Sequence, residues 1–399
     1  MHNSVRIADG LTYLGGNDRR IALFESAYPV PRGVSYNSYL LTDEKTVLFD
    51  TVDLSVSDLF FENLAYALDG RGLDYVVVHH MEPDHSATFA RLLEKYPSVT
   101  VVTNQKVAQM LKNYFGFAGN VHLVKEGDSL SVGRRTLTFV FAPMVHWPEV
   151  MFTYVPEDGI LFSADAFGTF GALPGSIFAD EVDFERDFLD DARRYYFNIV
   201  GKYGVQVQNV LKKAAGLDIR LVCPLHGPVW RRDFAWYLKK YLTWSAYEPE
   251  EKCVAVFYAS VYGHTQNAAE IVASAVAAEG VKVRTYDVSV THVSELVAEA
   301  FRFSHAVFAS TTYNNGIFVN MENFLGDLKA HAFQNRKYAV VENGSWAPQA
   351  GGLIEGALAP CKNLQLLGEK VTVLSAVNAE SAEKLVALGK LIAQDVKAN

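Results

Sequence analysis

The chain has 399 residues, of which 50% are hydrophobic and 13% aromatic, enough apolar side chains for more than one packed core. Its formal net charge of −9 at pH 7 argues against nucleic acid or an anionic membrane as a partner. No apolar run approaches the roughly 20 residues of a membrane-spanning helix, and the first residues lack the apolar core of a signal peptide. The three cysteines are far apart, which favours a reducing compartment. We therefore expect a two-domain, cytoplasmic protein.

Short β-branched runs bounded by turn residues recur through residues 1–247, with helical patterns between them. Strands are expected at 47–52, 75–80, 99–104, 137–143, 159–165 and 219–224, and helices at 59–68, 89–95 and 187–215. Sheets with helices packed outside them form an α/β layered sandwich. The polar, acidic segment 245–252, which contains Pro249, is the expected linker to a second domain.

From residue 253 to 399 strands and helices alternate regularly. Strands are expected at 254–259, 281–286, 305–310, 337–343 and 370–375, and helices at 265–279, 293–301, 320–330, 352–359 and from 379 onward. Five strands separated by helices predict a doubly wound parallel sheet of flavodoxin type.

Seven potential metal ligands follow four strands of the first part. They are His80, Glu82, Asp84, His85, His146, Asp165 and His226. Because side chains at the ends of neighbouring strands meet at one edge of a sheet, we expect four imidazoles and three carboxylates to converge on a two-metal site. Taken singly, each is more often a structural histidine or a solvated loop residue, and Asp84 could cap the helix that follows. The complete set at strand ends favours the metal site.

The types of ligand limit which metal ions suit the site. No cysteine is placed to bind, which argues against a structural zinc site. A mixture of imidazoles and carboxylates, with Asp165 as a candidate bridge, suits iron or manganese and is also open to zinc.

A loop between the first strand and helix of the second part could hold a phosphate with backbone amides and hydroxyls. It consists of Ser260, Val261, Tyr262, Gly263, His264 and Thr265. The loop has neither the glycine pattern of a dinucleotide site nor the lysine of a P-loop, and without Lys or Arg it would hold a monophosphate through neutral donors. It resembles the flavodoxin loop [ST]-x-T-G-x-T, with Tyr262 in place of a threonine.

Two further loops follow strands where the flavin ring lies in a flavodoxin fold. Their candidate cofactor-binding residues are Thr311, Thr312, Tyr313, Asn314, Asn315 and Gly316 in one loop, and Gly344, Ser345 and Trp346 in the other. Tyr313 and Trp346 could flank an isoalloxazine ring. The alternative is an α/β domain with ordinary turn residues, but three loops at one end of the sheet favour FMN.

The first part resembles the metallo-β-lactamase superfamily, whose hydrolases carry H-x-H-x-D-H where this chain has H-x-E-x-D-H. With His146, Asp165 and His226 following, the pattern resembles the flavodiiron proteins over the whole chain. The resemblance implies a metallo-β-lactamase-like αββα sandwich followed by a flavodoxin-like domain. It also implies one iron on His80, Glu82 and His146, a second on Asp84, His85 and His226, and Asp165 as the bridge.

The resemblance implies reduction of O2 to water, of NO to N2O, or of both, through FMN and two iron ions. No rubredoxin-like cysteine pair or nicotinamide domain is seen, so we expect a separate donor, rubredoxin or a similar small carrier. Arg231, Arg232, Lys239 and Lys240 could form a docking patch for an acidic donor, or a solvated helix face. A head-to-tail homodimer or a dimer of dimers is also implied. The alternatives are a zinc hydrolase fused to a flavodoxin-like module, and a non-catalytic gas or redox sensor.

Overall fold

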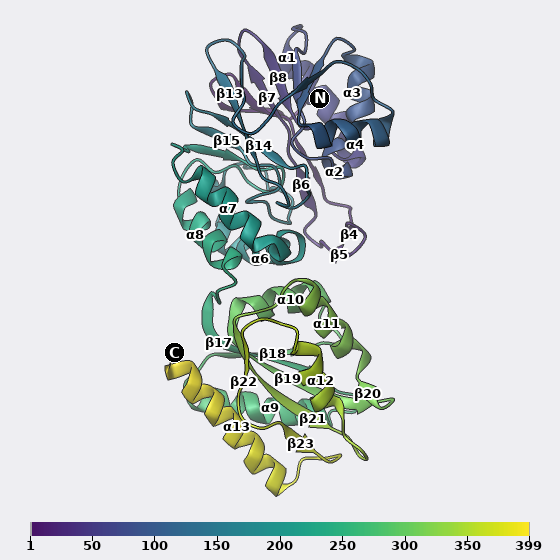
Figure 1. The fold of residues 1–399 in the computed structure, drawn as a ribbon, viewed down its shortest axis with the longest axis vertical. Helices are drawn as coiled ribbons and strands as arrows, with labels where there is room; N and C mark the ends of the chain where they lie inside the picture. Colours follow the sequence, from purple (N-terminus) through teal and green to yellow (C-terminus); the bar gives the residue numbers. More distant parts are fainter. Residues whose placement is uncertain (1, 399) are drawn as a thin grey trace. The chain divides into compact units, whose positions relative to one another are not determined.

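The computed structural model describes residues 2–398, which fold into two compact units (Figure 1). The first unit contains the chain up to Tyr196 together with Val205–Lys239. The second contains Phe197–Gly204 together with the chain from Lys240 onward. The chain therefore passes between the units three times, whereas the sequence predicts a single linker at 245–252.

Two sheets form the first unit. The seven-stranded sheet consists, in spatial order, of β1 (Val5–Ala8), β2 (Leu11–Tyr13), β7 (Tyr39–Thr42), β8 (Thr46–Phe49), β9 (Tyr75–Val77), β10 (Thr100–Thr103) and β11 (Val121–Leu123). The five-stranded sheet consists of β12 (Ser129–Ser131), β13 (Thr136–Phe141), β14 (Met151–Val155), β15 (Ile160–Phe162) and β16 (Leu221–Cys223). Two small pairs join β3 (Gly16–Asp18) to β6 (Val34–Tyr36) and β4 (Leu23–Phe24) to β5 (Tyr28–Pro29).

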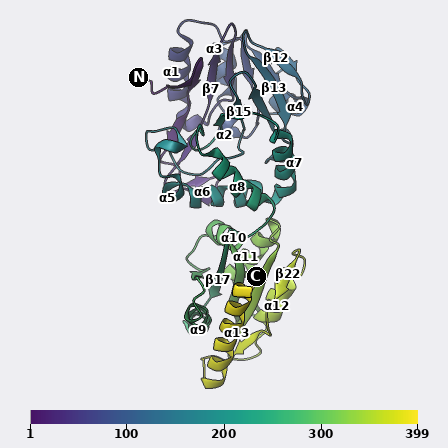
Figure 2. The ribbon, with the colours of Figure 1, turned by 90° about the vertical axis from the view of Figure 1, so that its left-hand side faces the viewer.

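The two sheets pack face to face through buried aromatic rings. Phe49 of β8 stacks on Phe162 of β15 with ring centroids 3.7 Å apart, and Tyr39 of β7 meets the Phe162 ring edge-on at 5.6 Å. Helix α1 (Ser57–Leu68) contacts the seven-stranded sheet at β7 (Figure 2), and α4 (Gln105–Phe115) contacts it at β11. The predicted layered sandwich is confirmed.

The helix predicted at 187–215 is wrong as a continuous element. The chain instead forms α5 (Phe184–Asp187), α6 (Leu189–Tyr195), a π-helical turn (Tyr196–Val200), a 3-10 turn (Gly201–Tyr203) and α7 (Gly204–Ala214). The interruption falls where the chain leaves the first unit, because Phe197–Gly204 belong to the second. The other helices before the second domain are α2 (Pro83–Ser86), α3 (Phe89–Lys95) and α8 (Phe234–Ser245), with 3-10 turns at Leu54–Val56 and Ala179–Glu181.

The second unit contains the predicted parallel sheet. Its strands, in spatial order, are β18 (Val283–Asp287), β17 (Glu251–Ala259), β19 (Phe303–Tyr313), β21 (Arg336–Asn343) and β22 (Leu364–Leu366), and all these neighbours pair in parallel. The fifth strand is split, because β22 pairs with the start of β21 and β23 (Val371–Val373) pairs with its end. Only the β23 portion follows from the sequence pattern. The short β20 (Gly316–Ile317) turns back on the end of β19.

The central strands β17, β19 and β21 are buried on both faces, which explains their long apolar runs. Val254, Val256 and Val307 point into the core with α9 (His264–Ala278) and α13 (Ala379–Ala398). The alternate residues Phe257 and Phe308 lie on the opposite face, where both approach Phe324 of α11 (Val319–Ala330). The remaining helices are α10 (Val293–Arg302) and α12 (Ala350–Leu358).

Across residues 2–398, none of the helices combines the length and the apolar character that a membrane span needs.

Candidate functional site

The structure brings all seven predicted metal ligands together in the first unit. His80 follows β9, Glu82 precedes α2, and Asp84 and His85 belong to α2. The other three come from loops, with His146 between β13 and β14, Asp165 after β15 and His226 after β16. The side chains are buried, and the most exposed of the seven residues, Asp84, is only 9% accessible. The seven side chains come together as expected, but not at the edge of a single sheet, because His80 follows a strand of the seven-stranded sheet and His146, Asp165 and His226 follow strands of the five-stranded sheet.

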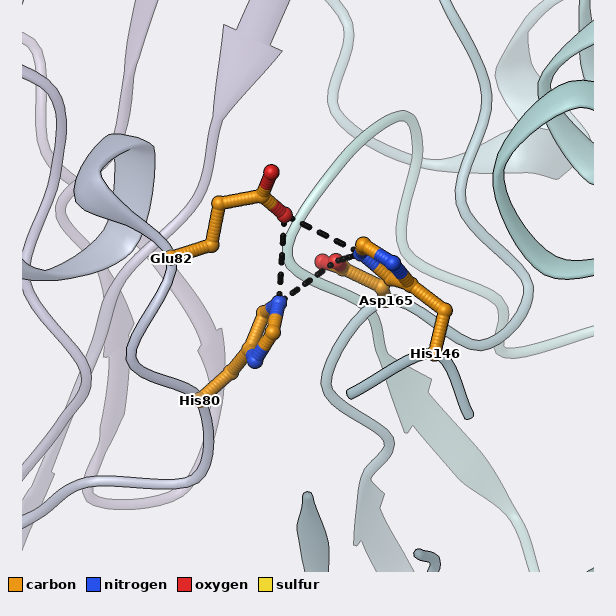
Figure 3. A group of neighbouring side chains, drawn as sticks. All are labelled: His80, Glu82, His146 and Asp165. Atoms are coloured by element: carbon orange, nitrogen blue, oxygen red, sulfur yellow. Dashed lines mark hydrogen bonds and ion pairs between the residues drawn. The ribbon is translucent and has the colours of Figure 1, made fainter. Parts of the chain in front are cut away.

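The first set of ligand atoms comes from His80, Glu82, His146 and Asp165. His80 and Glu82 extend from one loop, and His146 and Asp165 point toward them from two others (Figure 3). Nε2 of His80 lies 3.2 Å from Oε2 of Glu82 and 3.4 Å from Oδ2 of Asp165. Nε2 of His146 lies 3.0 Å and 3.1 Å from the same two oxygens. One ligand atom from each residue therefore fits within 4.8 Å of the others, which is close enough to hold one ion.

The second set consists of Asp84, His85 and His226. The Nε2 atoms of His85 and His226 are 3.1 Å apart, and Oδ2 of Asp84 lies 3.4 Å and 3.2 Å from them. Oδ1 of Asp165 lies 3.1 Å from Nε2 of His85 and 3.7 Å from Nε2 of His226. Asp165 therefore presents Oδ2 to the first set and Oδ1 to the second.

The residues present fit a pair of metal ions. Both carboxylate oxygens of Asp84 and Oδ1 of Asp165 are buried without a hydrogen-bond partner, which is rare for oxygens that no ion neutralises. The alternative role of Asp84 as a helix cap is wrong for the same reason. Two imidazole nitrogens as close as those of His85 and His226 must share a proton or an ion. Neither set contains a cysteine, so imidazole nitrogen and carboxylate oxygen are the donors.

The electrostatics of the site favour cations. Burial alone would lower the pKa of His85, but the carboxylates of Asp84 and Asp165 outweigh it and raise the pKa to about 9. The pKa of His146 rises to about 9 because Asp165 and Glu82 likewise outweigh burial. The pKa of Asp165 is held well below its usual range, because the neighbouring histidines outweigh burial. Ions that bind here would take the place of the protons on these imidazoles.

Several residues that surround the ligands have no signal in the sequence pattern. Glu25, after β4, is an exposed residue whose carboxyl lies beside Glu82, and desolvation of that carboxyl together with the Glu82 carboxyl raises its pKa to about 8. His79 is not a ligand, because its Nδ1 lies 2.5 Å from Oδ2 of Asp50 and its Nε2 lies 2.7 Å from Oγ1 of Thr153. These contacts join residues far apart in the chain, so only the folded structure reveals them.

The predicted flavin loops surround one pocket of about 850 Å³ in the second unit. It is lined by Ser260, Val261, Tyr262, His264, Thr265, Thr311, Thr312, Tyr313, Asn314, Asn315, Gly344, Ser345 and Trp346, and by Asn343 and Ser375, which the sequence analysis does not include. The predicted residues Gly263 and Gly316 do not line it. None of these lining residues is Asp, Glu, Lys or Arg, so His264 is the one side chain among them that can become a cation.

The geometry of the loops suits a phosphate and a planar ring. Gly263 has φ +92°, and its N–H donates to Oγ of Ser260 at 3.0 Å, so the loop turns directly into the start of α9. The Thr312 hydroxyl accepts hydrogen bonds from the backbone N–H groups of Gln349 and Ala350. These bonds tie the loop at 311–316 to the segment that follows the loop at 344–346. Trp346 is 79% exposed, so its ring is available to a ligand.

Comparison with known proteins agrees with both parts of the chain. Residues 34–227 match the ODP family beta lactamase, and residues 256–367 match flavodoxin. The anaerobic nitric oxide reductase flavorubredoxin of Aeromonas hydrophila is 32% identical over 88% of this chain and 71% of that protein. The nitric oxide reductase of Moorella thermoacetica is 32% identical over 98% of this chain and 99% of that protein. Rubredoxin oxygen:oxidoreductase from Desulfovibrio gigas has a TM-score of 0.93 with 27% identity, covering 99% of each chain.

The first domain is of β-lactamase type and contains two adjoining sets of buried histidines and carboxylates, and the second is a flavodoxin domain. Together they define a metal-binding flavoprotein of the oxidoreductase class. The extent and identity of the matches place it more narrowly. The chain belongs to the flavodiiron protein family.

Proposed function

We propose that the chain reduces O2 to water, NO to N2O, or both, at a pair of iron ions with electrons that pass through FMN. The observation that carries this proposal is Asp165, because its two oxygens face two adjoining sets of buried ligands. A carboxylate shared between two imidazole and carboxylate sets suits a redox-active pair such as iron. The names of the relatives, two nitric oxide reductases and an oxygen oxidoreductase, support the choice of gases.

A zinc hydrolase is the less well supported candidate. Glu82 supplies a carboxylate where the hydrolases that the first part resembles carry a histidine, and its oxygen lies 3.0 Å from Nε2 of His146. An additional anionic ligand favours a ferric ion. Hydrolysis also has no use for the pocket formed by the flavin loops of the second unit.

We assign His80, Glu82 and His146 to one iron and Asp84, His85 and His226 to the other, with Asp165 between them. When bound, two ferrous ions and one reduced FMN would together supply the four electrons that turn O2 into water, or the two that couple a pair of NO molecules.

The side chains around the second set keep it apolar. The rings of Phe24, Tyr36 and Tyr195 lie 5.5 Å, 5.8 Å and 5.5 Å from the ring of His226. On its other side, Nδ1 of His226 donates to the backbone carbonyl of Ser35 at 2.8 Å, which holds Nε2 toward the centre. These residues orient the ligand and exclude water, which suits a site for a small uncharged gas.

We further propose that rubredoxin or a similar small carrier is the electron donor, and that the protein works as a homodimer or a dimer of dimers in the cytoplasm. The donor follows from the name of the Desulfovibrio gigas relative. The three cysteines are unpaired, which is consistent with a reducing compartment.

The test is anaerobic purification followed by metal analysis, flavin extraction and turnover with each gas, using a reductase and rubredoxin as donor. We expect about two irons and one FMN per chain and consumption of at least one gas. A yellow protein that holds only zinc, even after reconstitution with ferrous iron, would sink the redox assignment.

A further inference from the structure

Glu149 is a buried carboxylate that contacts a metal ligand without belonging to either ligand set. It lies between β13 and β14, and its side chain is completely buried. Its Oε1 lies 2.8 Å from Nδ1 of His80 and accepts a second hydrogen bond from the backbone N–H of Met81 at 3.1 Å. Its backbone carbonyl accepts from Nδ2 of Asn104 at 2.7 Å. Glu149 is therefore fixed at both its side chain and its backbone.

The two histidines of the second ligand set have no carboxylate at Nδ1. Nδ1 of His226 donates to the neutral backbone carbonyl of Ser35. Nδ1 of His85 is buried with no hydrogen-bond partner among the described residues. The first ligand set thus has a carboxylate behind one of its imidazoles, and neither His85 nor His226 of the second set does.

A carboxylate at Nδ1 has two separate effects on a histidine ligand. As an acceptor, it keeps the proton on Nδ1 and leaves the Nε2 lone pair free to bind an ion. As an anion, it makes the imidazole a stronger donor. Oε2 of Glu149 is buried without a hydrogen-bond partner among the described residues, so the side-chain hydrogen bonds of Glu149 are those that His80 and Met81 make with Oε1.

The charges of the two sets differ as a result. The first set has the carboxylate of Glu82, one oxygen of Asp165, and Glu149 behind His80. The second has the carboxylate of Asp84 and the other oxygen of Asp165. More negative charge stabilises the higher oxidation state of an ion and binds it more tightly.

We infer that Glu149 is a positioning residue that holds His80 and makes the first ligand set the tighter-binding and harder-to-reduce position of the metal pair. This inference rests on the proposed two-metal function. It adds that the two metal positions differ in affinity and in ease of reduction.

Two substitutions distinguish the effect of Glu149 as a hydrogen-bond acceptor from the effect of its negative charge. Glu149→Gln keeps an oxygen that can accept from His80 and Met81 but removes the charge. Glu149→Leu removes both. Glu157→Gln is the matched control, because Glu157 is an exposed carboxylate in the same domain that accepts a hydrogen bond from the backbone N–H of Thr136 at 3.2 Å and is not a member of either ligand set.

The full-length iron- and FMN-loaded variants are compared by anaerobic redox titration, followed by electron paramagnetic resonance and Mössbauer spectroscopy. We expect Glu149→Gln to retain both irons, while the iron that is harder to reduce in the parent protein becomes easier to reduce and the other is unchanged. In Glu149→Leu one of the two ions should bind about 10- to 100-fold more weakly, and the other should remain. Glu157→Gln should match the parent protein.

A Glu149→Gln protein in which both irons shift equally, or neither shifts, would overturn the inference while leaving the proposed function intact. A second measurement does not depend on iron. The apoprotein is loaded with Co²⁺, and release to a chelator is followed by absorbance. Two release phases, of which only the slower is accelerated in Glu149→Leu, support the inference. Equal acceleration of both phases contradicts it, even if the native metal is not iron.

Discussion

Asp165 is the residue on which the metal centre depends most. Its Oδ2 lies 3.1 Å from His146 of the first set and its Oδ1 lies 3.1 Å from His85 of the second, so its carboxylate serves both sets at once. His146 contacts only the first set. Substitutions of these two residues are therefore expected to differ in how many metal ions are lost.

We predict that Asp165→Ala loses both ions and all gas reduction, whereas His146→Ala keeps the second ion and also loses turnover. Removal of a direct ligand should weaken binding by more than the roughly 10- to 100-fold typical of residues that only contact a ligand. FMN should stay bound and reducible in both variants, because the flavin loops belong to the other unit. Metal analysis and the visible spectrum measure these outcomes. Sustained turnover by Asp165→Ala would show that Asp165 is not the bridge.

Because Trp346 is exposed, its substitution can test FMN binding without changing the stability of the fold. Its side chain is 79% exposed, so truncation removes little packing from the described structure. We predict that Trp346→Ala leaves the melting temperature of the apoprotein unchanged within about 1 °C and weakens FMN binding about 5- to 10-fold, equivalent to about 1 kcal/mol of lost ring contact. Fluorescence titration of the apoprotein with FMN measures the affinity. Unchanged affinity would mean that Trp346 does not contact the flavin.

The ligands could be predicted from the sequence and their supporting residues could not, for a physical reason. His80 follows a strand of the seven-stranded sheet, and His146, Asp165 and His226 follow strands of the five-stranded sheet. The packing of the two sheets brings these strand ends together. Glu149, in contrast, reaches His80 across 69 positions of sequence, and the contact is set by packing between loops. No local pattern marks such a contact.

At the scale of elements, the sequence pattern predicts regular strands and helices and fails where tertiary contacts interrupt them. The alternating faces of β17 and β19 follow from their apolar runs. The helix predicted at 187–215 is interrupted at Tyr196–Val200 and Gly201–Tyr203, where the chain passes from the first compact unit into the second. The fifth strand splits because the segment between β22 and β23 leaves the edge of the sheet. Local propensity cannot anticipate either interruption.

The turn at Gly263 supplies a prediction about an element boundary. Gly263 has φ +92°, and a Cβ there would meet no atom within 4 Å, so Gly263→Ala acts through backbone strain alone. We predict about 1–2 kcal/mol of strain and about tenfold weaker FMN binding, since the phosphate loop must shift to relieve it. Gly280→Ala is the matched control, because Gly280 has φ +77°, equally open surroundings and a position outside the pocket.

Calorimetric unfolding and FMN titration of the two apoproteins distinguish strain from binding. Both variants should lose similar stability, and only Gly263→Ala should lose FMN affinity. Equal FMN affinity in the two variants would show that the loop at 260–265 does not hold the cofactor.

At the scale of the whole molecule, the proposed function requires electrons from a separate carrier. The basic residues considered as a docking patch are partly neutralised in the structure. Arg231 lies 3.1 Å from Asp180 and 2.7 Å from Glu181, and Lys240 lies 3.2 Å from Glu250. Arg232 is 3.9 Å from Asp180 with a side chain that is 75% exposed. Two of the four basic residues, Arg231 and Lys240, therefore have their charge compensated by nearby carboxylates.

We predict slow turnover with NADH alone and a large gain when a reductase and rubredoxin are added, because the loop at 260–265 lacks the glycine pattern of a dinucleotide site. The paired charges around Arg231 predict that the gain depends only weakly on salt between about 0.05 and 0.3 M, since steering by uncompensated charge is what salt screens. The measurement is the rate of gas consumption against carrier concentration at several ionic strengths, with Arg232→Glu as the variant. Arg232→Glu should lower the rate by less than about threefold. Rapid NADH oxidation by the protein without a carrier would refute the need for a separate donor, and a steep loss of rate with salt would show that charge steering operates despite these ion pairs.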